Sequence, residues 1–172
     1  MIIALSGYAR SGKDTVARMI KSLDPSIEIF GFSYPLKQVA EILTGIHANR
    51  WNEQGLKEKI IPGFDITGRE FLQRLGTEAM RNNFHKDVWV KALFSRYKQA
   101  SKWVITDCRF RNEAEWVKQF GGKVVRVIRP GVNPVNAHPS ETELDNWDFD
   151  AHIINDGTIE DLKKAVVEFY GY

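Results

Sequence analysis

Short apolar runs separated by longer amphipathic stretches recur along this 172-residue chain. The runs are of strand length and lie at residues 2–6, 27–32, 103–107, 124–128 and 152–154. Strands buried on both faces of a parallel sheet have this continuous apolar character. Because helical patterns lie between the runs, the sequence predicts a three-layer α/β fold, in which helices cover both faces of a five-stranded parallel sheet.

Apolar residues at helical spacing, with capping signals at the ends, indicate where the helices lie. The expected helices cover residues 13–22, 33–45, 67 onward, 87–99, 112–120 and 158 onward. Asn112 with Glu115 is interpreted as the cap of the fifth helix. The residues expected on the inner faces are Val16, Ala17, Ile20, Leu36, Val39, Ala40, Leu43, Phe71, Leu72, Leu75, Ala79, Ile159, Leu162, Val166 and Phe169.

The composition is that of an ordinary globular domain, with 43% apolar residues and a formal net charge of +2. This balance argues against a broad basic face for duplex nucleic acid. Cys108 is the only cysteine, which favours a reducing compartment. No secretory segment opens the chain, and no apolar run approaches the roughly 20 residues of a membrane span. We expect one domain over residues 1–172, in the cytoplasm, with no nucleic acid or membrane partner; a homodimer is left open.

Residues 7–15, Gly-Tyr-Ala-Arg-Ser-Gly-Lys-Asp-Thr, directly follow the first apolar run and fit the phosphate-binding loop pattern G-x-x-x-x-G-K. Glycines let successive N–H groups point at one anion, and the helix that begins at Lys13 adds its positive dipole. The Lys13 charge can reach the β- and γ-phosphates of a nucleotide. A chance glycine-rich turn is the weaker alternative. The residues expected to bind ATP here are Gly7, Arg10, Ser11, Gly12, Lys13, Asp14 and Thr15.

Two carboxylates are candidates to hold Mg²⁺. Asp14 stands where the general motif has a metal-binding Ser or Thr, and Thr15 follows it. Mg²⁺ prefers oxygen ligands and keeps several waters, so Asp14 could hold it directly or through water, while Thr15 could meet the α-phosphate. Asp107 ends an apolar run, where phosphate-loop proteins often place an aspartate beside the phosphates. A turn or capping acid is an equal alternative for Asp107.

Three arginines follow the ends of predicted strands, at the edge where open α/β sheets bind ligands. The planar guanidinium grips phosphate with two hydrogen bonds at once. Arg109 and Arg111 are therefore candidates to bind substrate, with solvated surface arginines as the alternative. Arg129 opens the stretch 130–150 and is the candidate to close onto the triphosphate.

A second set of candidates belongs to the predicted second and third helices. Arg69 lies one turn from Gln73, so the pair could grip a phosphate and a base edge. Lys37 lies early in the second helix. Phe32, just before that helix, could stack on a nucleobase, although core packing is the stronger interpretation. Together with Arg109 and Arg111, these are the expected substrate-binding residues.

Two long stretches, residues 44–66 and 130–150, resist the helix and strand patterns. Loops of this length in a compact domain are usually lids or binding segments, and a surface excursion with no role is the alternative. A metal site at His138 is rejected, because no second histidine lies at ligand spacing. Asn155 and Gly157 follow the last strand, where a loop can surround adenine; a plain turn is nearly as favoured.

A series of motifs extends, in a fixed order, along nearly the whole chain. They are Ser-Gly-Lys-Asp-Thr at residues 11–15, Tyr-Pro-Leu-Lys at 34–37, the segment 68–78, Asp-Val-Trp-Val at 87–90, the segment 105–115, Val-Ile-Arg-Pro at 127–130, His-Pro-Ser-Glu at 138–141 and Asn-Asp-Gly at 155–157. In these motifs the chain resembles the phage-type deoxynucleoside monophosphate kinases. The resemblance implies a phosphate-loop (P-loop) nucleoside monophosphate kinase fold, with a monophosphate-binding region at about residues 33–99 and a short lid at about 130–150.

The resemblance also implies the reaction, which is transfer of the γ-phosphoryl group of ATP to a deoxynucleoside 5′-monophosphate with Mg²⁺, in the host-cell cytoplasm if the protein is phage-encoded. The positions that carry over are Lys13, Lys37, Arg69, Asp107, Arg109 and Arg129, with Lys13, Asp107 and Arg129 as the catalytic residues. Animal phosphomevalonate kinases, which share a similar Ser-Gly-Lys-Asp loop, are a rival, and residues 72–78 favour the nucleotide enzyme. A non-catalytic nucleotide-binding regulator is the other alternative, against which the acceptor-side basic residues argue.

Overall fold

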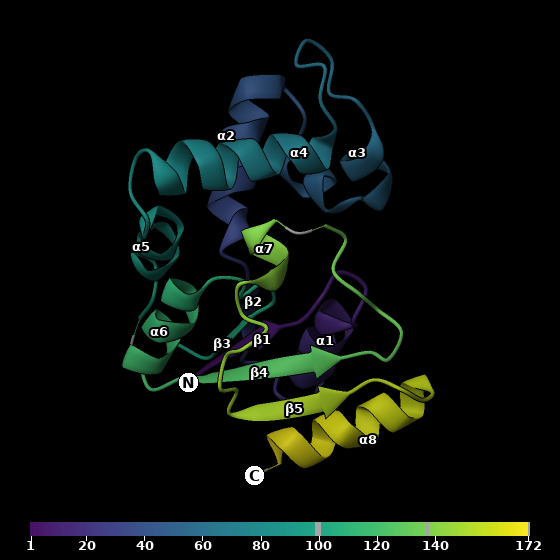
Figure 1. Ribbon diagram of the computed structural model, residues 1–172. Coiled ribbons are helices and arrows are strands. Elements are labelled where there is room, and N and C mark those ends of the chain that lie inside the picture. The colour runs from purple at the N-terminus through teal and green to yellow at the C-terminus, as the bar shows by residue number, and fades with distance from the viewer. Residues whose placement is uncertain (99–100, 137, 172) are drawn as a thin grey trace. The chain divides into compact units, whose positions relative to one another are not determined.

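The five apolar runs form strands β1 (Ile2–Ser6), β2 (Glu28–Phe30), β3 (Trp103–Ile105), β4 (Lys123–Ile128) and β5 (Ala151–Ile154). All of these strands pair in parallel, in the order β2-β3-β1-β4-β5 (Figure 1). In the register, Ile3 lies between Val104 and Lys123. The predicted parallel sheet is confirmed. The predicted second run extended to Phe32, but the chain turns into a helix there, so β2 is shorter.

The computed structural model describes residues 1–98, 101–136 and 138–171. They divide into two compact units, which we call the sheet unit (Met1–Gly31 and Tyr97–Tyr172) and the helical unit (Phe32–Arg96). The sheet unit holds the five strands with helices α1 (Lys13–Leu23), α6 (Arg111–Gln119), α7 (Pro139–Thr142) and α8 (Ile159–Tyr170). None of the described helices is long and apolar enough to span a membrane.

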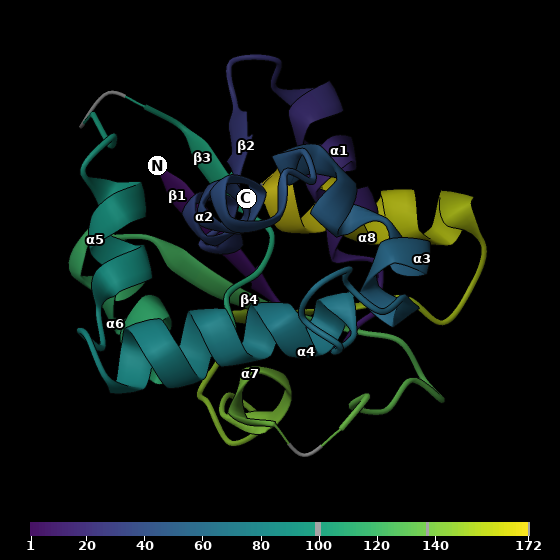
Figure 2. The same cartoon turned by 90° about the horizontal axis from the view of Figure 1, so that it is seen from above.

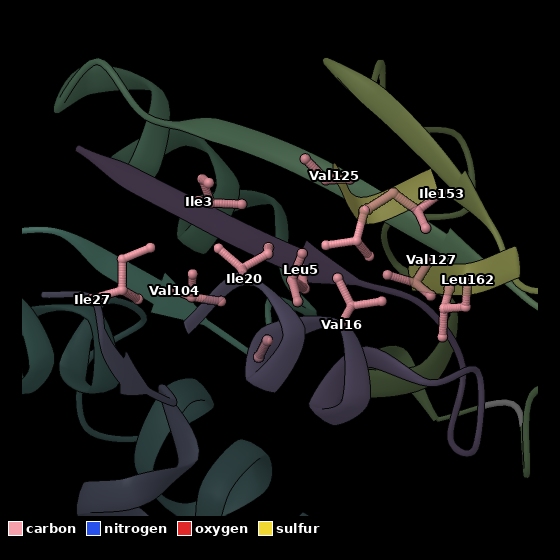
Figure 3. Packing of buried hydrophobic residues seen from close by; sticks show 12 residues of the cluster. Ile3, Leu5, Val16, Ile20, Ile27, Val104, Val125, Val127, Ile153 and Leu162 are labelled. Carbon is pink, nitrogen blue, oxygen red and sulfur yellow. The ribbon is translucent and has the colours of Figure 1, made fainter. Parts of the chain in front are cut away.

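One face of the sheet packs against α1 and α8. Alternate residues of the strands, such as Ile3, Leu5 and Val127, meet Ile20 of α1 and Leu162 of α8 in a continuous apolar cluster (Figure 3). Val16, Ala17, Ile20, Leu162 and Val166 are buried as expected. This cluster anchors the start of α1, and with it the loop that joins β1 to α1.

The other face of the sheet is covered by α6. Val117 of α6 and Ile2 of β1 meet at Gly122, where an added Cβ would lie 2.7 Å from Val117 Cγ1 and 2.9 Å from the Ile2 carbonyl oxygen. Ala114 and Val117 of α6 are fully buried. Helices therefore lie on both faces of the sheet, which confirms the three layers. The helix cap differs from the prediction: Glu113 Oε2 accepts from the backbone N–H of Phe110 over 3.1 Å, and α6 begins at Arg111.

The helical unit contains α2 (Ser33–Thr44), η1 (Ala48–Asn52), α3 (Gln54–Glu58), α4 (Gly68–Gln73), η2 (Arg74–Asn82) and α5 (Val88–Phe94). Figure 2 shows α4 and η2 as one continuous rod, in which η2 is π-helical. The helix predicted over residues 87–99 is shorter than expected, since α5 ends at Phe94, and Gln99 lies outside the described residues. Gly45 ends α2 in the left-handed conformation with φ of +71°, as its position predicted.

The helical unit has its own core, centred on Trp51. The Trp51 side chain is fully buried and stacks on Phe71 with ring centroids 5.2 Å apart. Leu56 and Ile61 join the same cluster. The prediction that residues 44–66 form an irregular loop is therefore wrong, because elements of five residues are too short to show a helical period.

Three apolar residues expected on inner helix faces are exposed. Leu43 of α2 is 50% exposed, Ile159 of α8 is 58% exposed, and Ala79 lies on the open side of η2. Leu43 and Ile159 lie in the last and first turns of their helices, where a helix leaves the layer that it packs on. Ala79 is displaced because a π-helical turn holds more residues than an α-helical one, which shifts the buried stripe.

Candidate active site

The phosphate-binding loop joins β1 to α1 in a conformation that requires its glycines. Gly7 and Gly12 have φ of +142° and +106°. A Cβ at Gly7 would lie 2.4 Å from the carbonyl oxygen of Val127, and one at Gly12 would lie 2.6 Å from Nδ2 of Asn155. Backbone packing therefore excludes a side chain at Gly7, while the neighbour at Gly12 is the end of a side chain. Arg10, at φ of +68°, is exposed.

Lys13 curls over the loop that precedes it. Its Nζ donates to the carbonyl oxygens of Gly7 and Tyr8, each over 2.7 Å. Burial, followed by the positive charge of Arg109, lowers the pKa of Lys13 to about 8. A partly desolvated ammonium whose lowered pKa shows that nearby carboxylates do not fully offset its burial is suited to receive a phosphate anion.

Asn155 braces the loop from the end of β5. Its side-chain Nδ2 donates to the Ser11 carbonyl oxygen over 2.9 Å, and its backbone N–H donates to the Ile128 carbonyl oxygen over 2.7 Å. Gly157 packs against Asp161 at the start of α8. The expected contact of Asn155 and Gly157 with adenine stays a prediction. The Ser11 Oγ is buried and has no hydrogen-bond partner among the described residues, which fits a loop built for an anion.

The two carboxylates expected near the metal lie at the carboxyl edge of the sheet. Asp107 follows β3 and faces Gly31, where an added Cβ would lie 2.9 Å from Asp107 Oδ2. Asp14 is exposed at the start of α1, and Thr15 accepts a long 3.5 Å bond from Arg18. Asp14 and Asp107 both raise the pKa of Lys13 against the larger lowering effects, so both lie within electrostatic reach of its ammonium. Among the described residues, no three His, Cys, Asp or Glu side chains form a metal cluster.

Arg109 is tied to the stretch expected to form the lid. Its Nη1 donates to Glu141 Oε1 over 2.6 Å and to the Ser140 carbonyl oxygen over 3.0 Å. Arg111 is exposed, and its backbone N–H donates to Glu143 Oε1 over 2.9 Å. The sequence pattern singled out Arg109 and Arg111 but gave no sign of these carboxylate partners, which lie more than 30 residues away on another segment.

Arg126 forms a second link that the sequence analysis missed. Its guanidinium lies over the ring of Tyr8 and over that of Phe149, 4.7 and 5.4 Å from their centroids, and donates to Asp145 over 2.8 Å. It also donates to Ser6 Oγ over 3.3 Å. Burial and the contact with Asp145 raise the pKa of the Tyr8 hydroxyl. A lone arginine within the apolar alternation of β4 was the available signal. Arg129, the predicted closing residue, is exposed just after β4.

The remaining candidates belong to the helical unit. Lys37 Nζ donates to Asn52 Oδ1 over 2.8 Å, and Arg69 and Gln73 lie half-buried on α4. Phe32 is 2% exposed and packs against Phe94 with ring centroids 6.3 Å apart. The burial of Phe32 and its packing on Phe94 favour the core interpretation, which the sequence had also made the stronger one, over stacking on a base.

Comparison with known proteins identifies the family. The family model described as "Deoxynucleotide monophosphate kinase" matches residues 52–166. A putative deoxynucleotide monophosphate kinase of Acanthamoeba polyphaga mimivirus is 30% identical over 97% of this chain and 94% of its own length. The chain belongs to the deoxynucleotide monophosphate kinase family.

A further relative supports this family assignment, and two solved structures share the fold of this deoxynucleotide monophosphate kinase family member. The deoxynucleotide monophosphate kinase of Enterobacteria phage T4 is 32% identical over 55% of this chain and 41% of its own length. Two solved structures show the same fold. Shikimate kinase from Aquifex aeolicus has a TM-score of 0.53 and 14% identity, over 99% of this chain and 96% of its own. Dephospho-CoA kinase from Campylobacter jejuni has a TM-score of 0.50 and 16% identity, over 99% of this chain and 95% of its own. The chain has a P-loop kinase fold and is a phosphotransferase of deoxynucleoside monophosphates, which decides against both alternatives.

Proposed function

We propose that the sheet unit binds ATP through the loop of residues 7–15 and that Lys13 acts on the phosphoryl group that moves to a deoxynucleoside 5′-monophosphate. The observation that supports this proposal is the Lys13 ammonium, whose pKa is lowered to about 8 and which donates to the carbonyl oxygens of Gly7 and Tyr8 in a loop where backbone packing excludes a side chain at Gly7. Phosphoryl transfer needs little covalent chemistry from the protein, only alignment and neutralisation of charge. Lys13 and the loop N–H groups are suited to both.

Mg²⁺ fits the chemistry of this edge. Asp14 and Asp107 offer carboxylate oxygens close to Lys13, and Mg²⁺ on a nucleotide takes most of its ligands from phosphates and water. The absence of a cluster of three ligating side chains among the described residues is compatible with such a site. We propose that Asp14 and Asp107 hold the ion, directly or through water. When bound, Mg²⁺ would neutralise charge on the β- and γ-phosphates.

For the acceptor, we propose that the helical unit is the monophosphate-binding region. Its span, Phe32–Arg96, is close to the expected residues 33–99, and Lys37, Arg69 and Gln73 are its candidate ligands. Within the sheet unit, Arg109 and Arg111 are the candidate cationic groups for a substrate phosphate.

The stretch 130–150 is the proposed lid, with Arg129 at its start as the residue that closes onto the moving charge. Closure would also exclude water, which would otherwise take the phosphoryl group.

The test is a coupled assay of ADP release with ATP, Mg²⁺ and a panel of deoxynucleoside and ribonucleoside monophosphates. We expect turnover that requires a deoxynucleoside monophosphate. Lys13→Ala should lower kcat/KM by about 10³-fold or more, because it removes a charge that stabilises the transition state. Lys21→Ala, an exposed lysine on the same helix α1, is the matched control and should keep wild-type activity. ATP turnover that ignores every monophosphate would refute the proposed function.

A further inference from the structure

A largely buried ion pair joins α7 to Arg109, in the segment between β3 and α6. The Glu141 side chain is 2% exposed and that of Arg109 is 33% exposed, with 2.6 Å between Glu141 Oε1 and Arg109 Nη1. The Ser140 carbonyl oxygen, also on α7, accepts from the same nitrogen. The backbone N–H of Arg109 donates to Glu113 Oε2 over 2.8 Å. Arg109 is therefore fixed both at its main chain and at its guanidinium.

The pairing leaves one side of the arginine for a ligand. Within the part of the chain that the structure describes, the side-chain hydrogen bonds of Arg109 come from Nη1. Nε and Nη2 form the other edge of the guanidinium fork, and such an edge binds a phosphate through two parallel N–H···O bonds. Glu141 thus restrains Arg109 without occupying that edge.

The pair lies within electrostatic reach of the phosphate-binding loop. Arg109 lowers the pKa of Lys13 and Glu141 raises it. Arg109 and Lys13 repel each other as like charges, and the Glu141 carboxylate offsets that repulsion. Removing Glu141 would therefore free the guanidinium to turn away from Lys13 into solvent.

The second oxygen of Glu141 indicates that folding alone does not explain this residue. Glu141 Oε2 is buried and has no hydrogen-bond partner among the described residues. A buried carboxylate oxygen without a donor lowers the stability of the folded state. A residue that costs stability in this way is typical of functional sites, where position matters more than stability.

We infer that Glu141 is a positioning residue that holds Arg109 with its open guanidinium edge toward a substrate phosphate. This inference rests on the proposed function, in which Arg109 binds a substrate phosphate. The short helix α7 then has a specific role: although it belongs to the proposed lid at residues 130–150, it orients the guanidinium of Arg109, which lies outside that stretch.

The experiment is a double-mutant cycle with Glu141→Ala, Arg109→Ala and the double variant, assayed for kcat and KM of the monophosphate. If Glu141 acts through Arg109, the double variant should match Arg109→Ala within about threefold, because the two effects are not additive. Glu141→Ala alone should lower kcat/KM by about 10²-fold, the cost of a misplaced group. Glu141→Gln should recover most of the loss, because its amide oxygen still accepts from Nη1. Glu115→Gln, an exposed carboxylate on α6, is the control.

The same cycle is measured by titration calorimetry as the Kd of the monophosphate with a non-hydrolysable ATP analogue, so the result does not depend on turnover. Losses that multiply in the double variant, or wild-type behaviour of Glu141→Ala, would overturn the inference while the proposed function stands. A wild-type protein that binds both nucleotides but transfers no phosphoryl group would refute the function, and the Kd cycle would still decide the role of Glu141.

Discussion

The hydrophobic pattern of the sequence predicts the sheet unit more directly than the helical unit. The central strands β1 and β3 of the sheet unit are buried along their whole length and read as continuous apolar runs, because a parallel strand between two helical layers is covered on both faces. The helical unit instead builds a core from elements of five to twelve residues around Trp51. Its apolar residues are buried by the meeting of several short elements. Burial on two faces therefore leaves a signal in the sequence, whereas burial at a junction does not.

The largest effect should come from the centre of each core. Trp51→Ala in the helical unit should lower the free energy of unfolding by about 3–5 kcal/mol, and Leu5→Ala in the sheet unit by about 2–5 kcal/mol, since both side chains are fully buried. Denaturation in urea, followed by circular dichroism, measures both. If residues 44–66 were a simple loop, Trp51→Ala would have almost no effect, and the comparison would fail.

The next effect separates glycines of the two units that both have positive φ. Gly12→Ala places a Cβ 2.6 Å from Asn155 Nδ2 at φ of +106°, whereas the Cβ of Gly45→Ala, at φ of +71°, meets no described residue within 4 Å. Each should destabilise by about 1–2 kcal/mol through backbone strain. Only Gly12→Ala should also raise the KM for ATP, because Asn155 must then release the loop. Equal kinetics for the two variants, with equal thermal midpoints, would contradict the role given to Asn155.

A smaller effect compares helix caps. In α8, Thr158 and Asp161 bond each other in both directions: Thr158 Oγ1 accepts from the Asp161 N–H over 3.3 Å, and Asp161 Oδ2 accepts from the Thr158 N–H over 3.1 Å. In α4, Thr67 Oγ1 accepts from the Glu70 N–H over 3.2 Å. Thr158→Ala should cost about 1–2 kcal/mol and Thr67→Ala about 0.5–1 kcal/mol. Thermal denaturation measures the loss of stability in each variant. A larger loss for Thr67→Ala than for Thr158→Ala would contradict this prediction.

A pH dependence of stability is also expected in the sheet unit, at Lys13. Burial lowers the pKa of Lys13 from 10.5 to about 8, so the folded protein binds fewer protons than the unfolded chain between these values. Stability contributed by this residue should therefore rise as the pH rises from about 8 toward 10.5. The difference in unfolding free energy between wild type and Lys13→Ala, measured across that range, should grow in favour of wild type. ATP binding should weaken over the same range, because phosphate needs the charged ammonium. A flat difference would show that Lys13 is not desolvated.

Much of the site was predictable because its chemistry is local. The loop of residues 7–15 needs glycines, a lysine and a helix start within nine positions, so the motif alone located it. Asp107 and Arg109 were predicted because they follow an apolar run directly, and parallel strands bring their ends to one edge. Phe32 was left open between base stacking and core packing, with core packing as the stronger interpretation, because an aromatic residue before a helix can serve either; its burial and its packing on Phe94 favour the core.

The sequence by itself determined the parallel sheet, the phosphate-binding loop and the family of this protein. Each of these is visible in short stretches of residues that are neighbours in the sequence. Only the tertiary structure decided that Glu141 pairs with Arg109 across 32 positions, that Arg126 lies over the rings of Tyr8 and Phe149, and that Trp51 is at the centre of a second core. These contacts join segments that are distant in sequence. They depend on how the elements pack, and hydrophobic patterning specifies which face is buried but not which partner covers it.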